Sequence, residues 1–244
     1  MGLRVVGLGP GDRLDMTGRV RLALAEAEII CGYDGYLELL AGLFPEKPRL
    51  GGGMGREVER CRSALGLAAE GRRVALVCGG DAGVYGMAGL VCQLAPEYPG
   101  VELEVAPGVP AAQAGAALLG APLGHDFAGI SLSDRLTPWP VIENRLRAAA
   151  AADFVLCLHN PASRARRDHL RRAAGVLLEI LPPETLCGWA RRIGRPGQSA
   201  GLLRLNELGD FPADMWTLVF VGARTTREIR GRMVTPRGYD LRGC

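Results

Sequence analysis

The chain contains a single lysine, Lys47, so nearly all of its 29 basic residues are arginines. They stand against 26 acidic residues, and the net charge of +3 is too small for a general binder of nucleic acid. A bias in genome composition accounts for most of the arginine excess. A second interpretation is carboxylate recognition, because the planar guanidinium pairs with a carboxylate through two hydrogen bonds.

Long apolar runs and paired cysteines are also missing. No run approaches the ~18 uninterrupted apolar residues of a membrane span, so no membrane partner is expected. The seven cysteines form no CxxC pair, which argues against a zinc or redox motif, and we expect no bound metal. Their odd number and the lack of a signal peptide predict a cytoplasmic protein. Cys78 and Cys157 lie in apolar runs and are expected in the core.

Short apolar runs alternate with longer helical patterns along the chain, and this alternation predicts an α/β fold with parallel sheets. The second half repeats the theme of the first. The predicted strands are residues 3–8, 28–32, 74–77, 101–105, 129–132, 154–158, 186–189 and 218–221.

The predicted helices follow from apolar spacing and from capping residues. Thr17 precedes a helix with Val20, Leu24 and Ala27 on one face, and further helices are expected at 57–69, 84–94 and 111–119. Thr137 is a candidate cap for a helix that starts at Pro138, and Asn160-Pro161 opens one with a stripe of Leu170, Ala174, Leu177 and Leu181. The weakest join lies near Gly120, so we predict two α/β domains, 1–120 and 121–244.

Two glycine loops follow predicted strands. The first, GLGPGD at residues 7–12, has Asp12 where a dinucleotide fingerprint needs glycine, and Pro10 lacks the backbone N–H that a pyrophosphate would use. This argues against a dinucleotide oxidoreductase.

The second loop, GGD at residues 79–81, places a carboxylate beside two glycines. A carboxylate repels phosphate but suits a ligand with hydroxyl groups and positive charge, such as S-adenosylmethionine. The equally weighted alternative is that Asp81 caps the following helix.

Three stretches occur together in order: GLGPG at 7–11, GGD with VYG at 79–86, and PGVPAA at 107–112. In combination the whole chain resembles the tetrapyrrole (corrin/porphyrin) methylases. Four further stretches are similar to the branch of that family that methylates C17 of precorrin-3B in cobalamin biosynthesis: CGYDGYLELL, GAPLGHDFAGISLSDRLTPW, LHNPASRARR and GRMVTPRGY.

The resemblance implies two α/β domains with the active site in the cleft between them, in a homodimer. It implies S-adenosylmethionine as methyl donor, S-adenosylhomocysteine as product, and a polycarboxylate tetrapyrrole as substrate. The expected reaction methylates C17 and contracts the macrocycle to precorrin-4. Alternatives are the cobalt-containing substrate of the same step, another methylase of the family such as the uroporphyrinogen enzyme, and a non-catalytic corrinoid carrier.

By motif position, the resemblance implies one set of residues that line the S-adenosylmethionine site. They are Pro10, Gly79, Gly80, Asp81, Val84, Tyr85, Pro110, Ala111, His159, Asn160 and Ala190. Many relatives carry a hydroxyl residue where Pro110 stands, so we expect backbone contact there. The last three positions rest on a looser motif.

Ring contraction removes a hydroxyl proton, and a positioned base would assist that step. The candidates are His125, Asp126, Asp134 and His159. Each has a structural alternative: a local His125–Asp126 pair at the domain boundary, a turn or cap at Asp134, and a helix entry at His159. His169, among arginines of a predicted helix, is expected on a solvated face.

The candidates for substrate contact are the aromatic residues after the second strand, two serines and a C-terminal arginine. They are Tyr33, Tyr36, Ser131, Ser133 and Arg237. A core role for the two tyrosines is equally plausible. A plain surface role is expected for Arg164, Arg191 and Arg192.

Overall fold

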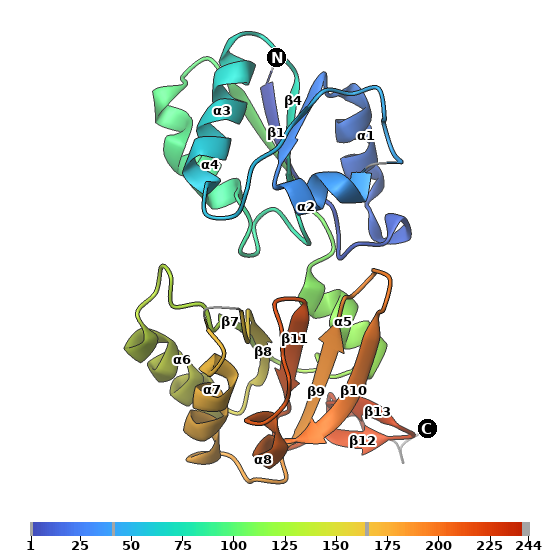
Figure 1. Ribbon diagram of the computed structural model, residues 1–244. Helices are drawn as coiled ribbons and strands as arrows, with labels where there is room; N and C mark the ends of the chain where they lie inside the picture. Colours follow the sequence, from blue (N-terminus) through green and yellow to red (C-terminus); the bar gives the residue numbers. More distant parts are fainter. Residues whose placement is uncertain (1, 41, 164–165, 241–244) are drawn as a thin grey trace. The chain divides into compact units, whose positions relative to one another are not determined.

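The computed structural model describes residues 2–40, 42–163 and 166–240, and divides the chain into two compact units, Met1–Ala111 and Ala112–Cys244 (Figure 1). The sequence places the boundary nine residues later, after residue 120. The difference arises because α5 (Ala111–Leu119) packs within the second unit. A methyl group at Gly115 would lie 3.0 Å from Ile193 and 3.3 Å from Ala190 and Phe220.

The sheet of the N-terminal unit is parallel throughout, with the strand order β3-β2-β4-β1-β5. Its strands are β1 (Gly2–Gly7), β2 (Ile29–Gly32), β3 (Arg49–Leu50), β4 (Val74–Cys78) and β5 (Glu102–Ala106). Helices cover both faces: α1 (Gly18–Glu26) and α2 (Asp34–Leu37) on one, α3 (Glu57–Ala69) and α4 (Ala88–Leu94) on the other (Figure 1). Single 3-10 turns lie at Arg13–Asp15, Glu38–Leu40 and Ala95–Glu97.

The central strand β4 explains why this part of the sequence reads as a continuous apolar run. Val74, Leu76 and Cys78 point toward α3 and α4, while Ala75 and Val77 point toward α1 and α2. A strand with helices on both faces has no polar side, so its sequence does not alternate. Cys78 is buried here, and Cys157 is buried in the second unit, as expected.

The helices of this unit confirm two predictions and correct a third. Thr17 caps α1 by accepting a hydrogen bond from Val20 N, and α3 has the predicted bounds. The helix expected from Val84 begins only at Ala88, with Met87 at its N-cap. The intervening residues form a loop in which Tyr85 has a positive φ of 54°, a conformation that interrupts a helix.

The sheet of the C-terminal unit is mixed, with the order β10-β9-β11-β8-β7. Only the β7–β8 pairing is parallel among its described strands, and the expectation of a second parallel sheet is therefore wrong. The connection from β9 to β10, residues 192–198, is too short for the helical crossover that a parallel pair needs. The strands are β7 (Phe127–Ser131), β8 (Val155–His159), β9 (Leu186–Arg191), β10 (Ser199–Arg204) and β11 (Thr217–Val221).

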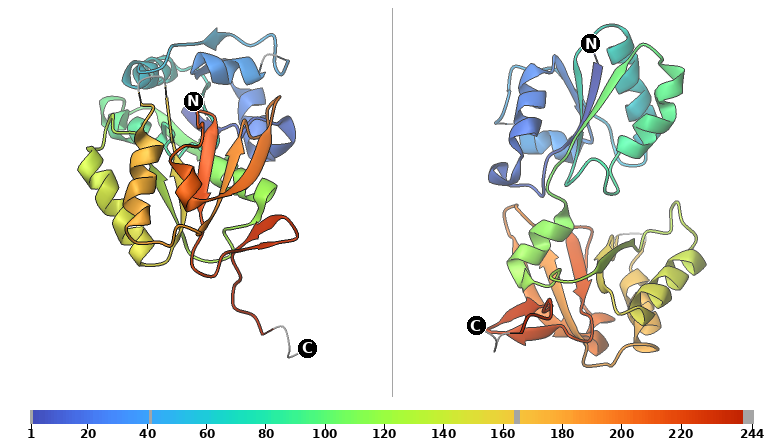
Figure 2. Two further views of the ribbon diagram at one scale, coloured as in Figure 1. Left: turned by 60° about the horizontal axis from the view of Figure 1, so that its bottom comes forward. Right: turned by 180° about the vertical axis from the view of Figure 1, so that it is seen from behind.

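A smaller sheet joins β6 (Gly120–Ala121) to the hairpin of β12 (Arg227–Ile229) and β13 (Arg232–Val234). The short α8 (Leu205–Leu208) follows β10. Seen from behind in Figure 2, α5 lies over one face of the larger sheet.

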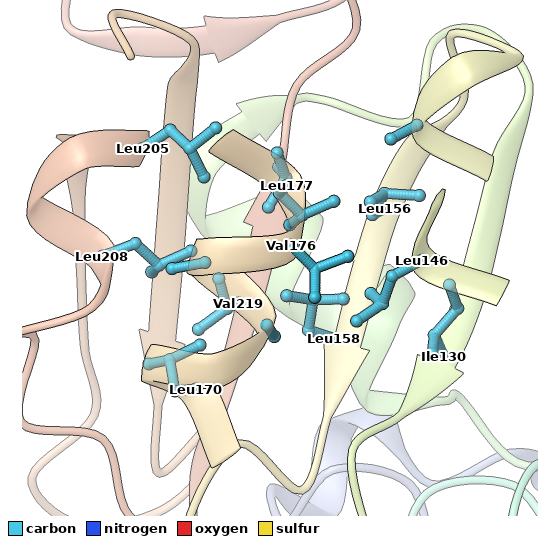
Figure 3. Packing of buried hydrophobic residues seen from close by; sticks show 14 of the residues in the cluster. Ile130, Leu146, Leu156, Leu158, Leu170, Val176, Leu177, Leu205, Leu208 and Val219 are labelled. Carbon is cyan, nitrogen blue, oxygen red and sulfur yellow. The ribbon is translucent and has the colours of Figure 1, made fainter. Parts of the chain in front are cut away.

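The opposite face of that sheet carries the core of the unit (Figure 3). Leu156 and Leu158 of β8 pack there against α6 (Trp139–Ala151) and α7 (His169–Leu178). Leu146 of α6 and Leu177 of α7 are fully buried in it.

Both helices start differently from the prediction. The N-cap of α6 is Pro138, and no side-chain hydrogen bond caps the helix, so Thr137 is not its cap. The helix expected at Asn160-Pro161 begins at His169, because Asn160 has a positive φ of 55° and the backbones of Ser163 and Arg166 bond to each other in an antiparallel bridge. The apolar stripe is nevertheless buried as predicted at Leu170, Ala174, Leu177 and Leu181.

Within the part of the chain that the structure describes, no helix has both the length and the apolar character that a bilayer crossing requires.

Adjacent leucines of α7 test the packing of this core. Leu177 is fully buried and Leu178 is 39% exposed. We expect Leu177→Ala to lower the free energy of unfolding by about 2–5 kcal/mol, because it leaves a cavity, and Leu178→Ala to cost far less. Urea unfolding followed by tryptophan fluorescence measures both, since Trp139, Trp189 and Trp216 all lie in the C-terminal unit. Equal losses would contradict the assignment of the buried face.

Candidate functional site

Three loops meet at one edge of the parallel sheet in the N-terminal unit. They follow β1, β4 and β5, and the carboxyl ends of adjacent parallel strands lie at the same edge, where α/β proteins bind ligands. Gly9 and Gly80 exchange two backbone hydrogen bonds, of 3.0 and 2.8 Å, which join the first loop to the second.

The carboxylate of Asp81 joins the second loop to the third. Its Oδ1 accepts hydrogen bonds from the backbone amides of Gly83 (2.8 Å) and Val84 (3.1 Å), within its own loop. Its Oδ2 accepts one from Gly108 N (2.9 Å), in the loop after β5. The proposal that Asp81 caps the following helix is wrong, because that helix starts at Ala88.

Glycine is required where these loops touch. A side chain at Gly108 would collide with the carbonyl oxygens of Gly80 and Gly7. Gly80 itself has a φ of +67°, which a residue with a Cβ rarely adopts. The backbone at this edge is therefore packed against itself and held in one conformation.

The structure brings the predicted cofactor residues of this unit together around that edge. Pro10 is buried, and the half-buried residues are Gly79, Gly80, Asp81, Pro110 and Ala111. Val84 and Tyr85 are 44% and 57% exposed, so they project from the second loop.

A pocket of about 140 Å³ adjoins the second loop. Tyr33 and Tyr36 line it, with their rings edge to face at 5.3 Å, and Gly79 and Tyr85 also contribute. The two tyrosines predicted to contact substrate therefore share a pocket with residues predicted to contact the cofactor. Arg60 of α3 lines it too and was not predicted from the sequence. The sequence did offer one indication that Arg60 is buried. It precedes Ala64 by four residues and Ala68 by eight, so it lies on the same face of α3 as these two buried alanines.

A second group of predicted residues lies at the carboxyl ends of β7 and β8 in the C-terminal unit. Ser131 pairs in register with His159, and Asn160 Nδ2 donates to Ser131 Oγ at 2.9 Å. Ser131 Oγ also accepts from Ser133 N at 3.3 Å, and Arg166 Nη1 donates to Ser133 Oγ at 2.9 Å. The sequence identified every member of this group except Arg166.

His159 and Ala190 differ in the group that each could offer to a ligand. Burial lowers the pKa of His159 from 6.5 to about 4, so its imidazole is neutral near pH 7. Ala190 lies inside β9 with its side chain fully buried, so a ligand contact there would have to involve the backbone.

Asp134 pairs with a histidine that the sequence assigned to a solvated face. His169 is 5% exposed, and its Nε2 lies 3.0 Å from Asp134 Oδ2. This contact holds the pKa of the Asp134 carboxyl below its usual value. The expectation for His169 is therefore wrong: it is the first residue of α7, and its ring packs edge to face on Trp139 at 5.2 Å.

The remaining candidates lie in exposed positions. Asp126 N donates to His125 Nδ1 at 2.8 Å, so these two residues form the local pair that the sequence allowed as an alternative. Arg237 is exposed. Arg192 is exposed as expected, whereas Arg191 donates from Nε to Thr217 Oγ1 at 3.2 Å and is part of the fold. Arg164 lies outside the described residues.

In the part of the chain that the structure describes, no group of three or more histidine, cysteine, aspartate or glutamate side chains is placed to hold a metal ion.

Residues 2–209 match the model of the tetrapyrrole (corrin/porphyrin) methylases. The chain belongs to this family. The "Probable cobalt-factor III C(17)-methyltransferase" of Salmonella typhimurium is 48% identical over 98% of this chain and 100% of its own length. The "Precorrin-3B C(17)-methyltransferase" of a Sinorhizobium species is 42% identical over 97% of this chain and 96% of its own length.

Among solved structures, the methyltransferase CobJ superposes with a TM-score of 0.89 at 39% identity. The match covers 96% of this tetrapyrrole methylase and 99% of the CobJ chain. The fold predicted from the resemblance, two α/β domains of the methylase type, is thereby confirmed.

Asp81→Asn tests the loop junction of this tetrapyrrole methylase. The amide nitrogen of asparagine cannot accept from Gly108 N, so one half-buried donor loses its partner, at a cost of about 1 kcal/mol. We expect faster amide hydrogen exchange at residues 79–84 and 107–111. Asp12→Asn is the matched control, because Asp12 accepts only a local bond from Leu14 N in an exposed turn. Unchanged exchange in Asp81→Asn would contradict the junction.

His159 predicts a pH dependence of stability. Its pKa is lower in the folded chain, about 4, than in the unfolded chain, about 6.5, so the unfolded state binds the extra proton between these values. Stability should therefore fall as the pH drops from about 6.5 to about 4, by on the order of 3 kcal/mol. Urea unfolding followed by tryptophan fluorescence at pH 7 and pH 4.5 measures it. His159→Gln should lose this component, and an identical pH profile in the variant would exclude it.

Proposed function

We propose that the protein transfers a methyl group from S-adenosylmethionine to C17 of precorrin-3B and contracts the macrocycle to give precorrin-4. The observation that carries this proposal is near-full-length identity to relatives named for C17 methylation, 48% and 42%. The cobalt-containing substrate of the same step is the second candidate, because the Salmonella relative is named for cobalt-factor III.

The loop edge of the N-terminal unit fits S-adenosylmethionine. The carboxylate of Asp81 would repel the pyrophosphate of a dinucleotide, whereas S-adenosylmethionine carries hydroxyl groups, an ammonium and a sulfonium. Asp81 accepts hydrogen bonds from the backbone amides of Gly83, Val84 and Gly108, and a carboxylate has about four acceptor positions. One position therefore remains for a donor on the ligand.

When bound, S-adenosylmethionine supplies an electrophilic methyl group. The tetrapyrrole supplies the carbon nucleophile, so the protein needs none of its own. Its main task is alignment, which can contribute several kcal/mol to a displacement. The rigid junction of Gly9, Gly80, Asp81 and Gly108 provides this alignment on the donor side.

Ring contraction requires a group that accepts a hydroxyl proton. The candidates differ in exposure, in protonation state and in the residues that they contact. Asp134 is partly exposed and its carboxylate is held ionised by buried His169. His159 is neutral and half-buried at the end of β8. We propose Asp134 as the base and His169 as the residue that positions it. His125 and Asp126 pair with each other at an exposed site.

The substrate side of the proposal comprises Tyr33 and Tyr36 beside the pocket and Ser131 and Ser133 at the ends of the parallel strands. Arg237 is proposed to contact a substrate carboxylate. We further propose that the enzyme works as a homodimer in the cytoplasm.

The proposal is tested by anaerobic incubation of the purified protein with precorrin-3B and methyl-labelled S-adenosylmethionine. We expect one labelled methyl group at C17 and an acetyl-bearing contracted ring, read by mass spectrometry and carbon NMR. Asp134→Asn should transfer the label but contract the ring at least about a hundredfold more slowly. Asp126→Asn is its control and should behave as the wild type.

The same incubation with the cobalt-containing substrate separates the two candidates. Turnover of that substrate alone would move the assignment to the cobalt form of the step. Transfer to neither substrate would overturn the proposed reaction. Contraction at the normal rate in Asp134→Asn would exclude Asp134 as the base.

A further inference from the structure

Arg60 is a charged side chain in an apolar position. It lies on α3 between the buried residues of that helix and is only 7% exposed. Charged residues are rarely buried to this extent unless they are paired. The partner of this guanidinium therefore decides what it does.

The observed contacts of Arg60 are all to neutral groups. Nη2 donates to the carbonyl oxygens of Gly52 (3.1 Å) and Gly53 (2.6 Å), and Nη1 contacts Met87 Sδ at 3.7 Å. Nε is buried without a hydrogen-bond partner. Among the residues that the structure describes, no carboxylate lies within ion-pair distance of Arg60.

A guanidinium in this state has unused capacity. It carries five N–H donors and stays protonated in proteins, so burial cannot be relieved by loss of the proton. A buried charge without a counter-charge is costly, and the weak thioether contact does not offset that cost. An anion from outside the chain would supply the missing partner.

The pocket beside the second loop gives an anion access to this charge. Arg60 lines it together with Tyr33, Tyr36, Gly79 and Tyr85. Its volume of about 140 Å³ holds a short carboxylate arm but not a tetrapyrrole ring. Glu57 also lines the pocket, but it accepts a hydrogen bond from Gly55 N (3.0 Å), so its carboxylate already has a partner.

We infer that Arg60 binds a carboxylate of a ligand that enters this pocket. The inference rests on the proposed function, which provides two sources of that chemistry: an acetate or propionate arm of the tetrapyrrole, and the methionine carboxylate of S-adenosylmethionine. Two donors of the guanidinium remain for either carboxylate, the Nε–H and one N–H of Nη1, and a hydrogen bond from a charged donor to a charged acceptor is stronger than one between neutral groups.

The test compares Arg60→Met and Arg60→Lys with the wild type. Methionine fills the buried space without the charge, and replacing a buried charge by an apolar group of similar volume is often tolerated. Arg62→Met is the matched control, because Arg62 lies on the same helix, is exposed and pairs with Glu97. A thermal melt of each variant checks folding.

Two equilibrium titrations distinguish the sources. Calorimetry measures binding of S-adenosylhomocysteine and of its decarboxylated analogue, and tetrapyrrole absorbance measures anaerobic binding of precorrin-3B. In one of the two titrations, Arg60→Met should bind the ligand about thirtyfold or more weakly than the wild type does. The affinity of Arg60→Lys should lie between the two. If the cofactor is the source, the wild type should also prefer S-adenosylhomocysteine over the analogue, and Arg60→Met should not.

Wild-type affinity for both ligands in folded Arg60→Met and Arg60→Lys would overturn the inference and leave Arg60 a structural tie to Gly52 and Gly53. If Arg60→Met does not fold, Arg60→Lys decides in the same way. Because both readouts are binding constants, they stand even if the wild type transfers no methyl group. A wild type without methyl transfer would contradict the proposed reaction but not the assignment of Arg60 as a carboxylate-binding residue.

Discussion

The hydrogen bonds accepted by Asp81 are the constraint on which the N-terminal site depends. Parallel strands bring three loops to one edge of the sheet, but a shared edge does not fix the distance between loops. The carboxylate does so by accepting from Gly83 and Val84 in one loop and from Gly108 in another. The glycines permit that closeness, since side chains there would collide with backbone. A carboxylate at the tip of a glycine turn thus has a structural role, to which the ligand contact proposed for it would add.

In the C-terminal unit, side-chain hydrogen bonds connect the segments that follow two parallel strands. Its parallel pair β7–β8 ends at Ser131 and His159, and the hydroxyl of Ser131 accepts hydrogen bonds from Ser133 and Asn160, which follow the strands. The mixed sheet around this pair is covered by apolar helices, so polar groups concentrate where the parallel strands end. His169 extends the polar set beneath the surface and holds Asp134 ionised near it. Packing on Trp139 fixes the imidazole and therefore the direction of the carboxylate.

Apolar spacing and capping residues correctly predicted the elements that depend only on residues close together in the sequence. The bounds of α3, the Thr17 cap and the buried run of β4 all follow from spacing and capping within a few residues. The errors arose where distant residues decide. Residues 84–87 were predicted to be helical, but the hydrogen bonds that Asp81 accepts from Val84 and Gly108 hold that segment as a loop. Strand direction in the C-terminal unit depends on loop length and pairing, which periodicity does not encode. His169 was misplaced because its partner, Asp134, lies 35 residues earlier in the chain.

The near absence of lysine has a different meaning on the surface and in the interior. Exposed arginines such as Arg62 and Arg147 pair with glutamates, as lysines would, and a bias in genome composition explains them. Arg60 and Arg166 contact neutral oxygens and a thioether, and each has a buried Nε without a partner. Lysine would not serve in these positions, because its three donors form a single point charge and not a planar fork. A high arginine content therefore points to carboxylate recognition only at positions such as Arg60, where a buried donor has no partner. A count of arginines does not separate these positions from the exposed ones.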